Sequence, residues 1–308
     1  AIAGGVQTFT EEILRTWVGG IIKKTGIKRV VCGGGVFMNV KANKIISEID
    51  GLEELFIFPS CGDESLSLGA SWIEYSELLK QKEELKQKEQ LKPIDSLKNL
   101  YLGGLCYEGN IEKIISKNIN EEDNISIKKS ENISLDTAEI IMNNHIIARC
   151  SGKMEWGARA LGNRSILCSA SDKNVNNWLN KKLKRTEFMP FAPIILKRKI
   201  KDYMYVKNLN DYLFMTITCL CKKIMIKKAP AAVHIDKTAR PQIIDKDINP
   251  RINSILENYY KITGVPVLIN TSFNMHEEPI VCTPVDAIRG FIDGKLDYLV
   301  INNFLIKK

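Results

Sequence analysis

Long apolar runs are absent from this sequence. No stretch approaches the roughly 18 to 20 apolar residues that a membrane-crossing helix needs, and no signal-peptide pattern is found. The eight cysteines are scattered and include no C-x-x-C pair, so they match neither a zinc site nor the disulfide framework of a secreted domain. These absences predict a protein of the reduced cytoplasm without a membrane partner.

Histidine is also scarce, and the common phosphate-binding motifs are missing. The three histidines, His145, His234 and His276, show no metal-ligand spacing, and nothing in the sequence completes a metal site. There is neither a G-x-x-x-x-G-K-[ST] loop nor a G-x-G-x-x-G fingerprint, and no internal repeat is evident. The sequence therefore excludes the two standard nucleotide-binding loops.

Length and charge set broad limits. The chain has 308 residues, 44% of them hydrophobic, and a formal net charge of +8. A prior of roughly 150 residues per domain predicts two domains. The charge does not by itself predict a nucleic-acid partner, because many lysines alternate with glutamates, as in residues 80–92. The sequence begins without Met and inside a helical pattern, which predicts a truncated protein.

The N-terminal third alternates between helical and strand patterns, which is typical of an α/β layer with ligands at its strand ends. The charged segment 74–91 contributes little to a core, and Pro93 would end such a helix. We therefore expect two domains, 1–92 and 93–308. In the first we predict helices at 6–24, at 36–49 and from 65 onward, and strands at 29–32 and 55–58.

The second region reads as a mixed sheet with several helices. An Asn- and Glu-rich piece, 118–132, predicts a surface loop with one short strand. The predicted strands are 100–102, 146–150, 192–196, 213–219 and 265–269, and the predicted helices are 111–117, 134–143, a short one before Lys181, 249–263 and 284–293.

The most informative stretch is 151–193, which holds eight Lys and Arg against three acids. Arg159 and Arg164 are spaced so that a loop or broken helix turns both guanidiniums inward, toward a phosphorylated ligand. Lys182, Lys184 and Arg185 follow a short helix. A solvated charged face is the competing interpretation, but the neighbouring Gly, Trp and Phe residues favour a lined pocket.

Four shorter motifs add polar groups near strand ends. Residues 33–35 are three glycines before Asn39, where free amides suit either a phosphate or a tight turn. Residues 62–65, Gly-Asp-Glu-Ser, fit either a metal ligand at Asp63 or a helix N-cap. Residues 240–242, Arg-Pro-Gln, and 270–274, Asn-Thr-Ser-Phe-Asn, are each unspecific alone. His276 fits either a base or a surface-loop histidine.

Taken together, these segments resemble the carbamoyltransferases that modify hydroxyl groups of nodulation factors, cephem antibiotics and aminoglycosides. The segments that carry the resemblance are GGVFMN (34–39), GDE (62–64), EWGARALGNRS (155–165), PFAP (190–193), RPQ (240–242) and NTSFN (270–274). The resemblance implies an α/β fold in which 1–92 is the second half of an actin-like, ASKHA-type domain. It implies that 93–308 is a YrdC-like α/β domain with a twisted mixed sheet.

The resemblance also implies an activity. The YrdC-like domain would form carbamoyl adenylate from carbamoyl phosphate and ATP, and the actin-like domain would pass the carbamoyl group to a substrate hydroxyl. ATP, carbamoyl phosphate and a divalent metal, Mg or Fe, are the implied cofactors and co-substrates. The family's metal-binding histidines belong to the first half of the actin-like domain, which this sequence lacks.

Site residues follow from the same resemblance. Arg159, Arg164, Lys184 and Arg240 would bind carbamoyl phosphate and the ATP phosphates, with Lys182 and Arg185 beside them. Asn270 and Ser272 would hydrogen-bond the nucleotide or the carbamate. In the other domain Gly34, Gly35 and Asn39 would hold the adenylate, and Asp63 would be the remaining metal ligand.

The sequence departs from the family pattern at two positions, and two other functions remain open. Met189 stands where many family members have Arg, and Ser65 replaces the usual glycine after Gly-Asp-Glu. The alternatives are a threonylcarbamoyl-adenylate synthase for tRNA and a non-catalytic phosphate-binding module of a split enzyme. The expected partners are a small molecule with a hydroxyl acceptor and either a separate N-terminal half or a second copy of the chain; nucleic acid is not expected.

Overall fold

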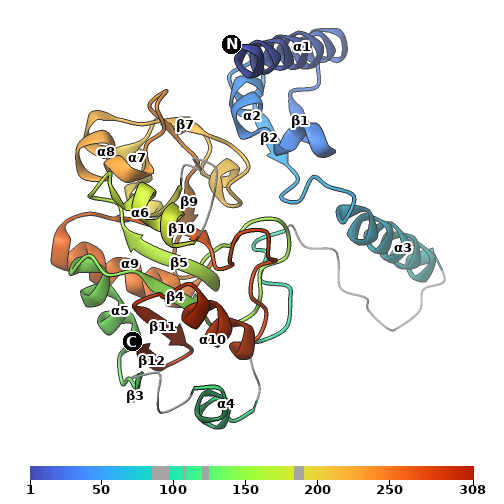
Figure 1. The fold of residues 1–308 in the computed structure, drawn as a ribbon. Helices are drawn as coiled ribbons and strands as arrows, with labels where there is room; N and C mark the ends of the chain where they lie inside the picture. The colour runs from blue at the N-terminus through green and yellow to red at the C-terminus, as the bar shows by residue number, and fades with distance from the viewer. Residues whose placement is uncertain (85–96, 107–108, 120–124, 184–190) are drawn as a thin grey trace. The chain divides into compact units, whose positions relative to one another are not determined.

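The computed structural model describes residues 1–84, 97–106, 109–119, 125–183 and 191–308, and separates the chain into two compact units, Ala1–Leu100 and Tyr101–Lys308 (Figure 1). The boundary expected after Lys92 lies outside the described residues. Among the residues that are described, no helix is long and apolar enough to cross a membrane.

The described residues of the first unit form two parallel strands and three α-helices. Strands β1 (Arg29–Cys32) and β2 (Glu54–Ile57) pair in parallel, with α2 (Val40–Ser47) in the crossover between them. Helix α1 (Ile2–Thr25) precedes this crossover and packs on α2, and α3 (Ser65–Glu84) follows it. The predicted alternation of helix and strand is therefore confirmed.

Helix α1 carries two apolar stripes. Leu14, Val18 and Ile22 recur every four residues and are buried, as expected for the core-facing side of an amphipathic helix. A second stripe remains exposed in the structure and contains Ile2, Val6, Phe9, Ile13, Trp17 and Ile21. Gly26 ends the helix in the left-handed conformation, with φ of 70°.

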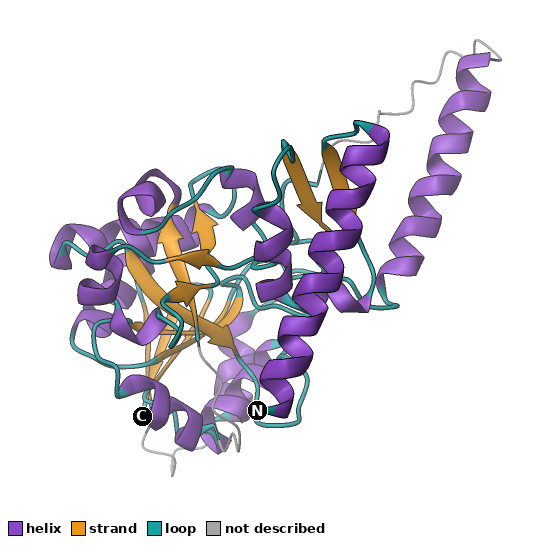
Figure 2. Ribbon diagram, turned by 90° about the horizontal axis from the view of Figure 1, so that it is seen from above, coloured by secondary structure: helices purple, strands orange, loops and turns teal. Residues whose placement is uncertain are grey.

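The second unit is built on an eight-stranded sheet in the order β3-β12-β11-β4-β5-β10-β6-β9. Only β11 with β4 and β6 with β9 pair in parallel, so the sheet is mixed, and Figure 2 shows its strands as a twisted layer with helices packed beside it. Its strands are β3 (Ser126–Lys129), β4 (Ile147–Cys150), β5 (Arg164–Ser169), β6 (Ala192–Leu196), β9 (Gln242–Ile244), β10 (Val267–Ser272), β11 (Tyr298–Ile301) and β12 (Phe304–Lys307).

Helices cover the central strands. Every residue of β4, β5 and β6 is buried, which indicates that both faces of the sheet centre are covered. Helices α5 (Ile133–Met142) and α9 (Pro250–Thr263) pack against each other and against this centre, while α10 (Pro284–Asp293) contacts β11 and β4. The remaining elements include α4 (Ile111–Asn118), α6 (Val175–Lys182), α7 (Ile200–Tyr203), α8 (Lys223–Lys228) and the short antiparallel pair β7 (Cys219–Leu220) and β8 (Thr238–Ala239).

Three predicted elements differ from the structure. The helix expected at 36–49 is split into a 3-10 turn, Gly35–Met38, and α2, because the Asn39 side chain caps α2 by accepting from the Ala42 amide. The strand expected at 100–102 is not formed. The strand expected at 213–219 shrinks to β7, with Met215 at a φ of 57° that breaks extended backbone.

Candidate active site

A cavity opens where three neighbouring strands of the large sheet begin or end. Asn270 and Ser272 lie at the end of β10, Ala192 begins β6, and Arg240 lies just before β9. Asn270 pairs with Ala192 on one side and Leu167 on the other, so the sheet register fixes its position. The loop before β5 adds Arg159, and the cavity encloses about 210 Å³. Segments more than a hundred residues apart in sequence thus form one site.

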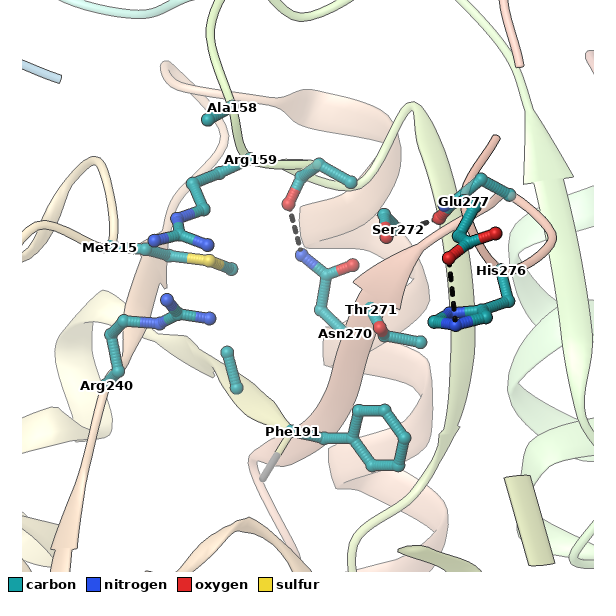
Figure 3. A pocket seen from close by; sticks show the side chains of 13 residues that line it. Ala158, Arg159, Phe191, Met215, Arg240, Asn270, Thr271, Ser272, His276 and Glu277 are labelled. Atoms are coloured by element: carbon teal, nitrogen blue, oxygen red, sulfur yellow. Dashed lines mark hydrogen bonds and ion pairs between the residues drawn. The ribbon is translucent and has the colours of Figure 1, made fainter. Parts of the chain in front are cut away.

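Two arginine side chains project into this cavity from opposite segments, as Figure 3 shows for Arg159 and Arg240. Neither guanidinium has a carboxylate or hydrogen-bond partner among the described residues. Burial lowers the pKa of Arg159. Burial and, to a lesser degree, the neighbouring charge of Arg159 lower the pKa of Arg240 to about 9. The cavity therefore holds two positive charges that repel each other, and an anion would relieve this repulsion.

The loop that carries Arg159 is held by a buried carboxylate. Glu155 Oε1 accepts the backbone N–H groups of Leu161 at 2.8 Å, Asn163 at 2.7 Å and Arg164 at 3.2 Å. The backbone N–H groups of a loop lack the partners that a helix or strand would provide. A carboxylate that accepts hydrogen bonds from several of them supplies these partners and fixes the loop. Glu155 therefore anchors the loop directly after Arg159.

Gly162 allows this loop to approach helix α9. Its φ is 110°, and a Cβ placed there would lie 2.7 Å from Ile252 Cγ1. Only glycine meets both conditions, because an L side chain would be strained by the φ and would clash with the helix. The glycine within the EWGARALGNRS segment therefore has a packing role.

Two buried amide side chains, of which Asn270 lines the cavity, fix each other by hydrogen bonds. Gln242 Nε2 donates to the Leu161 carbonyl at 2.8 Å, which directs its Oε1 toward Asn270 Nδ2 at 3.1 Å. Asn270 Nδ2 also donates to the Ala160 carbonyl at 2.8 Å. This leaves Asn270 Oδ1 as a buried acceptor with no partner among the described residues. A ligand N–H group would satisfy it.

The loop after β10 closes the other side of the cavity. Ser272 Oγ donates to Asn274 Oδ1 at 2.6 Å, and Asn274 Nδ2 donates to the Met275 carbonyl at 3.0 Å and the Glu278 carbonyl at 2.8 Å. The next two residues, His276 and Glu277, also line the cavity. The Glu277 side chain is 86% exposed, and its Oε1 lies 3.9 Å from His276 Nε2. Figure 3 shows it directed toward His276 and away from the arginines.

The residues of this cavity lie in a part of the chain that a protein-family model matches. A model of the carbamoyltransferase C-terminus matches residues 138–308, which include the whole cavity, and a model of the carbamoyltransferase N-terminus matches residues 1–72. The chain belongs to the carbamoyltransferase family. The six motifs that carry the resemblance all lie within the two matched ranges.

Relatives in this family are longer than the present chain. The uncharacterised protein MJ1051 of Methanocaldococcus jannaschii is 37% identical over 98% of this chain and 55% of its own length. The nodulation protein NolNO of Sinorhizobium fredii is 31% identical over 92% of this chain and 40% of its own length. A solved structure of full-length HypF in a phosphate- and nucleotide-bound form aligns with 58% of this chain and 22% of its own, at 18% identity and a TM-score of 0.41. The chain thus spans about half the length of the curated relatives it matches.

Arg164 does not lie in the cavity, contrary to the expectation that it joins Arg159 there. It begins β5, is fully buried, and donates from Nε to the Cys282 carbonyl at 3.0 Å. Its Nη1 donates to the carbonyls of Ser151 at 3.2 Å and Gly152 at 3.3 Å. The physical reason is the strand: β5 turns this side chain toward the backbone of neighbouring segments, while Arg159 stays in the preceding loop.

Lys182 is also displaced from the expected position. Its Nζ pairs with Asp297 Oδ1 at 2.9 Å and lies 4.3 Å from the Trp178 ring centre. It lines a different cavity, together with Lys181, Trp178, Asp293, Gly294 and Lys295. Because it closes helix α6, the end of the helix directs it toward Asp297 and not toward Arg159. Lys184 and Arg185 lie outside the described residues.

In the first unit, the predicted ligand groups are in a turn and a cap. Gly34 has φ of 104°, and Gly35 begins the 3-10 turn. The Asn39 side chain caps α2 and donates to Gln7 Oε1 at 2.8 Å, so its polar atoms already have partners. Asp63 is exposed, and the described part of the chain holds no group of three His, Cys, Asp or Glu side chains that could bind a metal ion. Asp63 therefore lacks the further ligands that a metal ion would need.

Three residues of the site were not singled out from the sequence. Glu155 and Gln242 lie inside motifs that carry the family resemblance. Nothing in their spacing indicates that Glu155 anchors the loop or that Gln242 fixes Asn270. Met215 lines the cavity from a segment predicted as a strand. A carboxylate beside a glycine-rich, amide-rich loop is the signal that would have identified Glu155 as the anchor of that loop.

Proposed function

We propose that Tyr101–Lys308 forms carbamoyl adenylate from carbamoyl phosphate and ATP, and that the intact protein transfers the carbamoyl group to a hydroxyl of a small molecule. One observation carries the proposal. Arg159 and Arg240 face one cavity without an acidic partner among the described residues, in a chain of the carbamoyltransferase family. Two unpaired guanidiniums match the charge of a phosphorylated substrate.

The proposed chemistry has two steps that these residues support. Carbamoyl phosphate loses its phosphoryl group to water, giving carbamate and phosphate. A carbamate oxygen then attacks the α-phosphorus of ATP, an O–P bond forms, and the bond to the β-phosphate breaks to release pyrophosphate. Fixed positive donors lower the barrier of both steps, because negative charge gathers on the phosphoryl oxygens. Arg159 and Arg240 are the described residues that supply them.

Asn270 supports the carbamoyl part of the proposal. Its buried Oδ1 has no partner among the described residues and matches an N–H donor of the carbamoyl group. The Nδ2 group is committed to Ala160 and Gln242, so the amide cannot simply rotate to satisfy Oδ1. Ser272 would contribute through its oxygen, since its hydrogen is given to Asn274.

The size of the cavity favours the smaller substrate. A volume of about 210 Å³ is smaller than most ligand cavities and suits carbamoyl phosphate better than a whole ATP molecule. We therefore assign carbamoyl phosphate to Arg159, Arg240 and Asn270. Gly34, Gly35 and Asn39 remain proposed contacts of the adenylate in the first unit, where the carbamoyl group would be transferred.

Pyrophosphate release tests this proposal directly. The chain is incubated with ATP and carbamoyl phosphate, and pyrophosphate is measured in the native protein, in Arg240→Gln and in Arg198→Gln. Arg198 is the matched control, because it forms an exposed pair with Glu257 at 2.6 Å. We expect release only when carbamoyl phosphate is present, retained in Arg198→Gln and lost in Arg240→Gln. Release that needs threonine and bicarbonate, or equal release in all three proteins, would contradict the proposal.

A further inference from the structure

Two cysteines outside the cavity lie in contact. Cys106 Sγ is 3.2 Å from Cys150 Sγ, and both side chains are buried, with exposed fractions of 4% and 0%. The backbone brings them together: residues before Cys106 pair with the chain that follows β4, and the Cys106 amide donates to the Gly152 carbonyl at 2.8 Å. Two thiols held at this separation need little movement to bond.

Positive charge surrounds this pair. Arg164 is fully buried and its Nη2 group has no hydrogen-bond partner among the described residues. Arg149 is buried beside it and donates to the Gly162 carbonyl at 2.5 Å, while Arg251 Nη1 donates to Asn302 Oδ1 at 3.2 Å. Glu155 is the carboxylate that offsets Arg149. One further negative charge near Arg164 would be stabilised.

Cys106 is the thiol that meets this need. A hydrogen bond from Cys150 and then the charges of Arg164, Arg149 and Arg251 lower the pKa of Cys106, outweighing the effect of burial. The pKa of Cys150 is raised, first by its hydrogen bond to Cys106 and then by burial. One cysteine therefore has the character of an attacking thiolate and its neighbour that of a resolving thiol.

The other cysteines lack this combination. Burial raises the pKa of Cys168 to about 12 and that of Cys32 to about 11. Burial and then the charge of Cys61 raise the pKa of Cys32, and burial and then Glu64 raise the pKa of Cys61. Cys282 is exposed but has no neighbouring thiol among the contacts of the described residues. Proximity and positive surroundings coincide at Cys106 and Cys150.

We propose that Cys106 and Cys150 form a redox-active dithiol, a modification site that a peroxide converts to a disulfide. The Cys106 thiolate attacks one oxygen of hydrogen peroxide, so an S–O bond forms, the O–O bond breaks, and hydroxide leaves as water after protonation. Cys150 then attacks the sulfenic sulfur, an S–S bond forms, and water leaves with the remaining proton. Two thiols are oxidised and one peroxide is reduced to two waters. A peroxide is small enough to reach a nearly buried sulfur.

Peptide mapping tests the proposal on the full chain. The reduced protein is treated with one equivalent of hydrogen peroxide, free thiols are blocked with N-ethylmaleimide during denaturation, and the digest is analysed by mass spectrometry without reductant. We expect a linked peptide pair containing Cys106 and Cys150 that dithiothreitol separates. The pair is expected to be lost in Cys106→Ala and Cys150→Ala and kept in Cys168→Ala, a matched change of a buried cysteine on β5.

A trapping arm adds a second readout, and the native protein alone decides the case in which a variant fails to fold. In Cys150→Ala, dimedone is expected to label Cys106, because the sulfenic acid then has no resolving thiol. In the native protein, recovery of both Cys106 and Cys150 as maleimide adducts while Cys282 is oxidised would overturn the proposal. A sulfinic acid at Cys106 without the linked pair would overturn it as well.

Discussion

The segment EWGARALGNRS connects two kinds of arginine. Arg159 faces a cavity opposite Arg240, and neither has an acceptor among the described residues. Arg164, five residues later, and its neighbour Arg149 are fully buried and donate to backbone carbonyls. Guanidiniums bound to carbonyls support the fold, whereas the guanidiniums of the proposed ligand site face a cavity. The same residue type thus occurs in one motif in two different surroundings, and the hydrogen-bond partners distinguish them.

Removing Arg164 should produce the largest effect, on stability. Arg164→Leu leaves the carbonyls of Ser151 and Cys282 without the Arg164 donor in a buried site, while the Gly152 carbonyl keeps the Cys106 amide. We expect the free energy of unfolding to fall by about 4 kcal/mol, because each unsatisfied buried carbonyl costs roughly 1 to 3 kcal/mol. Urea unfolding measures it, and Arg198→Leu, on an exposed pair, should cost less than about 1 kcal/mol. Unchanged stability with lost ligand affinity would place Arg164 with the ligand-binding arginines.

Removing Arg240 should have the opposite pattern. Arg240→Gln is expected to weaken carbamoyl phosphate binding by about 2 kcal/mol, or roughly thirtyfold, which is the worth of a hydrogen bond to a charged group. Its unfolding midpoint should be unchanged or higher, since the variant relieves the repulsion from Arg159 that helps to lower the pKa of Arg240. Calorimetric titration and urea unfolding of one preparation measure both quantities. A large loss of stability would make Arg240 a structural residue like Arg164.

An added carboxylate should sharpen the distinction. Ala158 is exposed and lines the cavity beside Arg159, so Ala158→Asp supplies an acidic partner that Arg159 lacks among the described residues. We expect carbamoyl phosphate binding to weaken by about 1 kcal/mol, or roughly fivefold, since a partly exposed pair contributes at that level. Ala158→Asn, nearly identical in shape and neutral, should retain the native affinity. Equal losses in both variants would indicate a steric effect instead of a charge effect.

The smallest expected effect is on stability and concerns the start of helix α10, next to Cys282, whose carbonyl accepts a hydrogen bond from Arg164. Burial opposes ionisation of Asp286, but hydrogen bonds from Thr283 N, Thr283 Oγ1 and Cys282 N outweigh it and lower its pKa below the ordinary 3.8. Because the folded pKa is lowered, this stabilisation is complete above pH 3.8 and is lost as pH falls through the folded pKa.

The measurement compares Asp286→Asn with the native protein. At pH 7 the variant should be less stable by about 0.5 kcal/mol, the typical worth of a carboxylate at a helix N-terminus. Urea unfolding at pH 7 and at about pH 3 should show this difference shrinking toward the lower pH. A difference that stays constant with pH would mean that the carboxylate charge does not stabilise the start of α10.

Much of the fold followed from local patterns. The helix at 284–293 was predicted to the residue, because Pro284 and the Thr283 to Asp286 capping box mark its start. Strand β5 was missed, since its six residues follow a glycine-rich loop and are identified as a strand only by pairing with β4 and β10. The hairpin of β11 and β12 was also missed. Pairing between distant segments is not encoded in local spacing.

The site was predictable in its membership and less so in its roles. Arg159, Arg240, Asn270 and Ser272 were expected and lie together, although their roles stay predictions. Arg164 and Lys182 were expected beside them and lie elsewhere, because strand β5 and the Lys182 to Asp297 pair direct their side chains away. Basic residues near glycine indicate an anion site, but side-chain direction depends on the element that each residue enters.

The most direct measurement is a double-mutant cycle on Arg159 and Arg240, in which calorimetric titration measures the affinity of each protein for carbamoyl phosphate. The two side chains should hold one anion, so each Gln substitution is expected to lower affinity by at least tenfold, and the double variant should lose less than the sum of the two single losses. Native affinity in all three variants would contradict the assignment of this pair as the ligand-binding arginines.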